Sequence, residues 1–231
     1  MGKRNLSNII LTGFSYTGKT QVSRILAQRL QWDLVDTDDE IEKLAGKSIP
    51  EIFAQAGEDH FRKLERQALT NVCRKNNTVI STGGGIIMAD ENRRIMEASG
   101  AVVCLEARPE TIYNRLMIDS GKSDDKVVRP LLAVPDPLER ITSLKDSRQS
   151  NYAKCDWAVH TDKLTLEEVA SEVIHGWNLL RRNEIKSHWD TACIVTTATA
   201  SYPVFVGWGL LDTLGERMKK AGLNGNALVI S

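Results

Sequence analysis

The chain has 231 residues, enough for one large domain or for one domain and part of another. Its 30 basic residues balance 30 acidic ones, so no net positive field favours a nucleic acid partner. No apolar run approaches the roughly 18 residues of a membrane span, and the first strand-like run begins too early for a signal peptide. We therefore expect a cytoplasmic globular protein. Its cysteines should be reduced core thiols, since Cys73, Cys104, Cys155 and Cys193 form no C-x-x-C pair.

The first apolar run, residues 8–11, is followed by a glycine-rich segment that fits G-x-x-x-x-G-K-[ST], the phosphate-binding P-loop. The run predicts a buried strand, and apolar residues at helical spacing from Val22 to Leu30 predict a helix after the loop. Backbone N–H groups of such a loop point at phosphate oxygens, and the helix directs its positive end at the same anion. The expected ATP-phosphate site comprises Gly13, Ser15, Tyr16, Thr17, Gly18, Lys19, Thr20 and Gln21.

Two side chains of the P-loop have distinct expected tasks. Lys19 brings a mobile positive charge to the outer phosphates, and the hydroxyl of Thr20 is placed to ligate Mg²⁺. A glycine-rich turn with an incidental lysine is the alternative. The strand before the segment and the helix after it favour the P-loop, because the mechanism needs both.

Strand-like and helix-like segments alternate after the P-loop. We expect strands at residues 32–35, 78–81, 101–105 and 157–159, and helices that begin near residues 48, 61, 109, 138 and 165. Ser48 with Glu51, and Thr165 with Glu168, have the spacing of capping boxes. Residues 118–128 are polar and without periodicity, which predicts a mobile loop. The alternation predicts a parallel sheet covered on both faces, with ligands at the carboxyl ends of its strands.

Acidic residues follow the second predicted strand. Asp36 and Asp38 flank Thr37, and alternation along an extended segment would put both carboxylates on one side. One could then serve Mg²⁺ and the other a substrate hydroxyl. A cluster at a helix N-terminus is the alternative, because Ile41 and Leu44 follow at helical spacing.

Three further segments allow a structural or a functional interpretation. Arg62 has glutamates nearby, which by itself predicts a surface ion pair on a helix. The segment Gly83-Gly84-Gly85 follows a strand and could be a flexible turn, or could let a ligand approach backbone N–H groups closely. Arg148 lies in a predicted helix, where a solvated arginine is the simplest expectation.

Taken together and in this order, the segments resemble shikimate kinase. The matching pieces, which span about residues 6–178, are the P-loop, Asp36-Thr37-Asp38, residues 48–65, Gly83-Gly84-Gly85, Arg129-Pro130-Leu131-Leu132, and Arg148 with Tyr152. The resemblance implies a three-layer α/β/α P-loop fold with a five-stranded parallel sheet, related to nucleoside monophosphate kinases. It also implies that ATP phosphorylates the 3-hydroxyl of shikimate, giving shikimate 3-phosphate and ADP in aromatic amino-acid biosynthesis.

The resemblance assigns the phosphate side of the reaction to particular residues. Lys19 and Thr20 handle phosphate and Mg²⁺, and Asp36 supports the metal through water. Arg129 is the lid arginine that reaches the phosphates on closure, and Arg115 lies near the adenine. Tyr16 and Thr17 stand where the family more often has smaller residues, and the lid segment before Arg129 is longer than usual.

The resemblance also assigns the substrate side. Asp38 holds the shikimate hydroxyls and accepts the proton. Arg62 and Arg148 bind the shikimate carboxylate, helped by the segment Gly83-Gly84-Gly85. A planar guanidinium suits that task because it can grip a carboxylate with two hydrogen bonds.

The pattern changes after about residue 180. Residues 194–197, 202–207 and 227–230 are strand-like, with helical spacing between residues 210 and 218. Residues 201–212 resemble the opening of 3-dehydroquinate synthase, and residues 227–231 resemble the strand that leads to its NAD site. We expect a kinase domain at residues 1–178, a linker at 179–190, and at 191–231 the incomplete start of a synthase domain in a bifunctional protein, without synthase activity.

Two other functions use the same motifs. Another P-loop small-molecule kinase, acting on an anionic alcohol such as a sugar acid, would also employ Arg62 and Arg148. A non-catalytic nucleotide-binding scaffold is the second alternative. It would be expected to lack Lys19, Asp38 or Arg129, and all of these are present.

Overall fold

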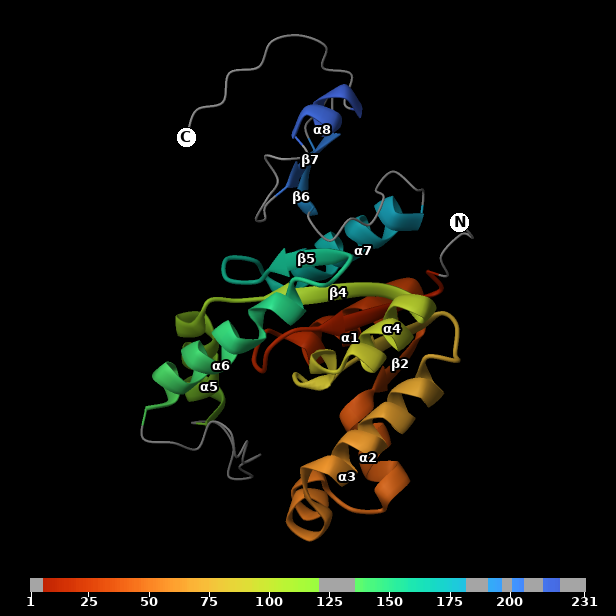
Figure 1. Cartoon of the computed structure of the whole chain (residues 1–231), viewed down its shortest axis with the longest axis vertical. Coiled ribbons are helices and arrows are strands. Elements are labelled where there is room, and N and C mark those ends of the chain that lie inside the picture. Colours follow the sequence, from red (N-terminus) through yellow and green to blue (C-terminus); the bar gives the residue numbers. More distant parts are fainter. Residues whose placement is uncertain (1–5, 121–135, 182–190, 197–200, 206–213, 221–231) are drawn as a thin grey trace. The chain divides into compact units, whose positions relative to one another are not determined.

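The computed structural model describes residues 6–120, 136–181, 191–196, 201–205 and 214–220 (Figure 1). The chain divides into two compact units, Met1–Trp189 and Asp190–Ser231. The first unit contains a parallel sheet in the order β2-β3-β1-β4-β5. Its strands are β1 (Asn8–Thr12), β2 (Asp33–Asp36), β3 (Thr78–Ser81), β4 (Gly100–Glu106) and β5 (Trp157–His160).

Helices cover both faces of this sheet (Figure 1). On one face, α1 (Lys19–Leu30) packs against α7 (Leu166–Arg181). The other face is covered by the C-terminal part of α3 (Ile49–Val72) and by α4 (Asp90–Ser99), α5 (Pro109–Ser120) and α6 (Pro137–Tyr152). There Ile10 and Val102 of the sheet pack with Met96 of α4 and Tyr152 of α6. The predicted three-layer fold is confirmed.

The central strands explain where the site can form. Every residue of β1 and β4 is buried, as expected for strands that are covered on both faces. Leu11 of β1 and Asp36 of β2 both pair with Ser81 of β3, so these strands end at the same level. The segments that follow them therefore leave from one edge of the sheet, which is where ligands bind in such folds.

A helical pair follows β2 and projects from the sheet (Figure 1). It consists of α2 (Thr37–Ala45) and the first part of α3, where Ile41 and Ile52 pack with Phe61 and Ala68 of the second part of α3. The Glu51 carboxylate accepts hydrogen bonds from the backbone N–H and the hydroxyl of Ser48, which confirms the predicted start of a helix. Gly57, with φ 75°, separates this first part from the longer one predicted from residue 61.

Two short elements were not predicted. The 3₁₀ turn η1 (Ile86–Met88) and helix α4 follow β3 directly and lead to β4. Asn92 of α4 is buried and donates from Nδ2 to the Ile86 carbonyl at 3.0 Å. This contact fixes the end of the glycine segment that follows β3.

The second unit contains a hairpin and a helix. Strands β6 (Thr191–Thr196) and β7 (Ser201–Phe205) pair antiparallel, and α8 (Leu214–Lys220) follows. The strands overlap those predicted at 194–197 and 202–207. The strand predicted at 227–230 lies outside the described residues, as do residues 121–128 of the predicted loop, whose first residues belong to α5. Within the described ranges, no helix is long and apolar enough to cross a membrane.

Candidate active site

The P-loop has a backbone that few other residues could form. Gly13 has φ 133°, and a Cβ there would lie 2.3 Å from the Leu105 carbonyl oxygen of β4. Gly18, with φ 97°, is the N-cap of α1. Tyr16 takes φ 62°, in the left-handed region that residues other than glycine seldom occupy. The loop is therefore wedged against the end of β4 and curls into the start of α1, the geometry of an anion cradle.

Side chains of the P-loop either brace it or face solvent. Lys19 donates from Nζ to the carbonyls of Gly13 at 2.9 Å and Phe14 at 2.8 Å. Thr17 is buried, and its hydroxyl donates to the Phe14 carbonyl at 2.9 Å. Thr20 is exposed in the first turn of α1, so its hydroxyl is accessible to a ligand. Lys19 thus holds a positive charge directly beside the cradle.

The acidic segment after β2 differs from the expected extended one. The strand ends at Asp36 and α2 begins at Thr37, so Asp38 lies in the first helical turn. Asp36 is the N-cap, and its Oδ1 accepts from the backbone N–H of Asp38 at 2.9 Å. The expected alternation along a strand is wrong, and the helix N-terminus is the correct interpretation. The cap contact turns the chain, and it sends Asp38 toward the segment after β3.

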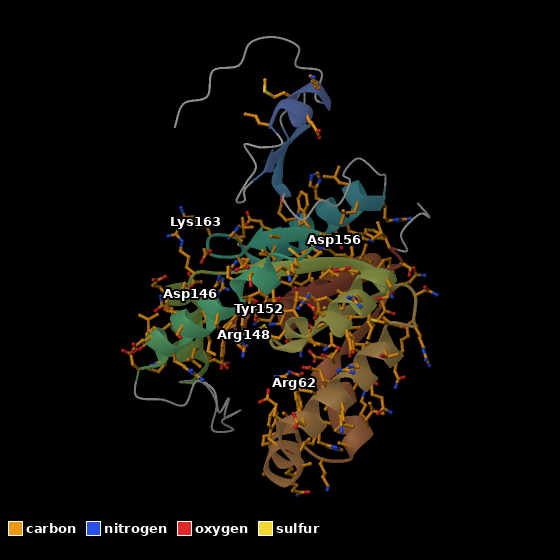
Figure 2. The ribbon with its side chains drawn as sticks, in the orientation of Figure 1. Arg62, Asp146, Arg148, Tyr152, Asp156 and Lys163 are labelled. Atoms are coloured by element: carbon orange, nitrogen blue, oxygen red, sulfur yellow. The ribbon has the colours of Figure 1, made fainter. Side chains whose placement is uncertain are left out.

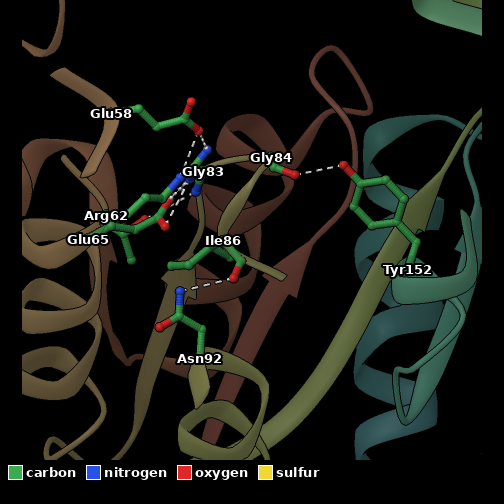
Figure 3. Close-up of polar contacts among 9 residues, drawn as sticks. Glu58, Arg62, Glu65, Gly83, Gly84, Ile86, Asn92 and Tyr152 are labelled. Carbon is green, nitrogen blue, oxygen red and sulfur yellow. Dashed lines mark hydrogen bonds and ion pairs between the residues drawn. The ribbon is translucent and has the colours of Figure 1, made fainter. Parts of the chain in front are cut away.

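The segment Gly83-Gly84-Gly85 is a meeting point of the site (Figure 3). A Cβ on Gly83 would lie 2.7 Å from Oδ1 of Asp38, and one on Gly85 would lie 3.1 Å from Nη1 of Arg62. A Cβ on Gly84 would lie 3.4 Å from the Gly13 carbonyl oxygen of the P-loop. None of the three glycines has a positive φ. Close approach by Asp38 and Arg62, rather than an unusual backbone, therefore favours glycine at positions 83 and 85, while at Gly84 the P-loop lies at ordinary contact distance.

Arg62 is held in place by two carboxylates of its own helix (Figure 3). Its Nη1 lies 3.0 Å from Oε1 of Glu65, and its Nη2 lies 3.0 Å from Oε1 of Glu58. The expected surface pair forms with Glu58, whose side chain is exposed, and Glu65, which is 3% exposed, adds a buried partner. Burial lowers the pKa of Arg62, but the two carboxylates raise it more. Burial also raises the pKa of Glu65 against the influence of Arg62. The pair fixes a charged guanidinium beside Gly85.

Arg148 and Tyr152 both lie on α6 (Figure 2). The Arg148 guanidinium carbon lies 5.9 Å from the centroid of the Phe14 ring in the P-loop, within cation–π range. Tyr152 is 1% exposed and donates from its hydroxyl to the Gly84 carbonyl at 2.7 Å. The structure therefore brings Arg62 and Tyr152, from two helices far apart in sequence, to one glycine turn, and it places Arg148 over the neighbouring P-loop.

Arg115 lies at the opposite flank of the P-loop. It donates to the Tyr16 carbonyl at 3.1 Å and to the Thr161 hydroxyl and carbonyl at 3.0 and 2.7 Å. Burial lowers the pKa of Arg115. Through these bonds, Arg115 connects α5 to the P-loop and to Thr161, the residue that follows β5. Arg129, the expected lid arginine, lies outside the described residues.

The structure also shows partners that the sequence argument did not single out. Phe14 supports Arg148, and the Thr37 hydroxyl accepts from the Gly83 N–H at 3.1 Å. Glu65 could have been found, because it stands three residues after Arg62 on a predicted helix. For Thr37 and Phe14 no local pattern distinguishes a supporting residue from any other, since their partners are distant in sequence.

Thr20 and Asp36 supply a donor set that fits Mg²⁺. Both offer hard oxygen atoms, and Asp36 uses Oδ1 for the helix cap. Among the residues that the structure describes, no three His, Cys, Asp or Glu side chains cluster to hold a metal by themselves. Mg²⁺ in kinases is usually bound by one or two protein oxygens together with phosphates and water, so Thr20 and Asp36 would suffice as the protein ligands.

Comparisons with known proteins agree with this geometry. The shikimate kinase family pattern matches residues 16–177. A shikimate kinase of Caldanaerobacter subterraneus subsp. tengcongensis is 42% identical over 176 residues, 76% of this chain and 99% of that protein. One of Deinococcus radiodurans is 43% identical over 166 residues, 72% of this chain and 81% of that protein.

Solved structures give the same result. A shikimate kinase from Acinetobacter baumannii in complex with shikimate superposes with a TM-score of 0.68 at 32% identity, covering 78% of this chain and 96% of that one. A gluconokinase from Sinorhizobium meliloti, at 16% identity and a TM-score of 0.55, shares the fold alone. With the family pattern matched over most of the chain and the P-loop, glycine turn and two arginines assembled at one sheet edge, this chain belongs to the shikimate kinase family.

Proposed function

We propose that this kinase transfers the γ-phosphoryl group of ATP to the 3-hydroxyl of shikimate. One observation carries the proposal: Arg62 from α3 lies beside Gly85, Arg148 from α6 lies over Phe14 of the P-loop, and Gly84 contacts that loop. Two guanidinium groups at that place suit a carboxylate, and the adjacent cradle suits a triphosphate. An acid that carries a hydroxyl group, held between them, would present that hydroxyl to the phosphate.

The position of each residue determines which part of the two substrates it would bind. Lys19 and the loop N–H groups neutralise and orient the phosphates, because phosphoryl transfer depends mainly on positioning and charge stabilisation. Asp38, beside Gly83, holds the hydroxyl and accepts its proton. Arg62, Arg148 and the glycine turn bind the carboxylate.

The nucleotide and metal roles rest on the P-loop and on the family resemblance. Thr20 and Asp36 would hold Mg²⁺, which when bound neutralises phosphate charge. Arg115 would flank the adenine, and Arg129 would reach the phosphates when the lid closes and excludes water. In this assignment, the kinase domain comprises residues 1–178.

Changing Arg62 tests both the substrate and the clamp. We expect wild type to release ADP from Mg-ATP only when shikimate is present. Arg62→Ala should raise the KM for shikimate on the order of 10²-fold, because it removes a charged group from a buried polar contact. A coupled assay of ADP release measures both constants.

Arg66→Ala is the matched control, since Arg66 lies on the same helix with its side chain 49% exposed and should leave the KM for shikimate unchanged. Thermal unfolding of each variant shows whether Glu65, left without Arg62, has destabilised the fold. ADP release that is indifferent to shikimate would refute the substrate, and a panel of other anionic alcohols would follow. ATP binding without any turnover would favour a scaffold.

We also propose that residues 191–231 begin a 3-dehydroquinate synthase-like domain, joined by a linker at 179–190. The support is the resemblance of residues 201–212 and 227–231 to that family. The match to the Caldanaerobacter enzyme spans 99% of that protein but 76% of this chain, so the second unit is additional to that kinase. Reading the coding sequence downstream tests the proposal: metal ligands and an NAD site of the synthase would support it, and a stop codon at that point would refute it.

A further inference from the structure

Tyr152 is the buried residue that joins the two sides of the site. Its side chain belongs to the core beneath α6, yet its hydroxyl reaches the carbonyl of Gly84 at 2.7 Å (Figure 3). Gly84 in turn lies against the P-loop, since a Cβ at Gly84 would stand 3.6 Å from the backbone N of Ser15. A hydroxyl bond to this carbonyl therefore fixes the turn relative to both α6 and the phosphate cradle.

The same hydroxyl also interacts with Arg148. Arg148 stands one helical turn before Tyr152 on α6, so its positive charge acts on the phenol. Burial raises the pKa of Tyr152 to about 12, although Arg148 opposes this. The phenol is thus neutral at physiological pH and keeps the proton that it donates to the Gly84 carbonyl.

We propose that Tyr152 is a positioning residue for substrate: its hydroxyl holds the Gly83–Gly85 turn in place through the Gly84 carbonyl. The inference rests on the proposed function, in which this turn and Arg148 together bind the substrate carboxylate. Tyr152 acts through Gly84 rather than on the reacting atoms. Its loss should therefore weaken the hold on the carboxylate and leave the nucleotide side intact.

Steady-state kinetics of ADP release by the full chain tests this role. Tyr152→Phe keeps the packed ring and removes only the hydroxyl. It should raise the KM for shikimate about three- to tenfold, the effect of one net hydrogen bond, with the KM for ATP unchanged. Tyr113→Phe is the matched control, because Tyr113 is half-buried, packs against the same core and should alter neither constant.

A double-variant cycle separates positioning from packing. Arg148→Lys and Tyr152→Phe act on one clamp, so their combined effect on the KM for shikimate should be smaller than the product of the single effects. Effects that multiply would overturn the proposal, as would an equal rise in the KM for both substrates or a loss confined to kcat. Circular dichroism sets an assay temperature at which every variant is folded.

The wild-type measurement distinguishes a failure of the positioning role from a failure of the proposed function. Wild-type turnover that depends on shikimate, with a normal KM in Tyr152→Phe, refutes the positioning role and leaves the proposed function standing. Wild-type turnover without shikimate dependence refutes both.

Discussion

Replacing Lys19 with methionine should lower kcat on the order of 10²–10³-fold, the usual effect of removing one preorganised donor from a charge-stabilising site. Lys19 holds its ammonium group 2.9 Å from the Gly13 carbonyl, at the mouth of the cradle. The ammonium group is therefore already near the place where negative charge develops on the transferring phosphoryl group. Methionine has similar length but no charge, so the chemistry should suffer more than the packing.

Coupled assays of kcat and calorimetric measurements of ATP binding give the test. Lys75→Met is the control, because Lys75 is exposed and lies at the amino edge of the sheet, where its carbonyl accepts from the side chain of Asn8. That variant should keep wild-type kinetics. A Lys19→Met protein that retains kcat within an order of magnitude would show that the loop lysine is not used for catalysis.

Replacing Lys145 with methionine should reduce the free energy of unfolding by about 3–5 kcal/mol. Lys145 of α6 forms an ion pair with Glu106 at the end of β4, with an Nζ–Oε2 distance of 2.8 Å. The two side chains are 13% and 8% exposed, and Gln149 donates to the same carboxylate at 3.1 Å. Methionine would remove the positive charge and leave the Glu106 carboxylate buried without it. Removing one member of a buried pair costs more stability than replacing both members by apolar residues.

Urea denaturation measures this effect. Lys43→Met makes the same change in an exposed pair with Glu40, where the lysine side chain is 70% exposed. That control should stay within about 0.5 kcal/mol of wild type. Equal effects in the two variants would mean that the buried pair does not anchor α6. A loss at Lys145 alone would show that the helix carrying Arg148 and Tyr152 depends on an ionic contact with the sheet.

The glycine turn illustrates how far sequence reasoning reaches. Gly83-Gly84-Gly85 after a strand indicated either a flexible turn or a close approach, and nothing in the residues themselves decided between them. The structure shows which protein groups approach the turn: Asp38 and Arg62 lie close to where a Cβ on Gly83 and on Gly85 would stand, and the P-loop lies at contact distance from Gly84. Those neighbours come from three separate parts of the chain, and only packing brings them together.

The sequence by itself determined the features that depend on local spacing. These are the P-loop between a strand and a helix, the capping boxes at Ser48 and Thr165, and the parallel sheet implied by alternating elements. Short-range sterics and hydrogen bonds specify such features, so they can be read along the chain.

Tertiary structure decided the features that depend on distant partners. It buried the Glu65 carboxylate beside Arg62, and it paired Lys145 with Glu106. Each depends on which elements pack against one another, because burial and charge pairing arise only when the sheet and its helices come together.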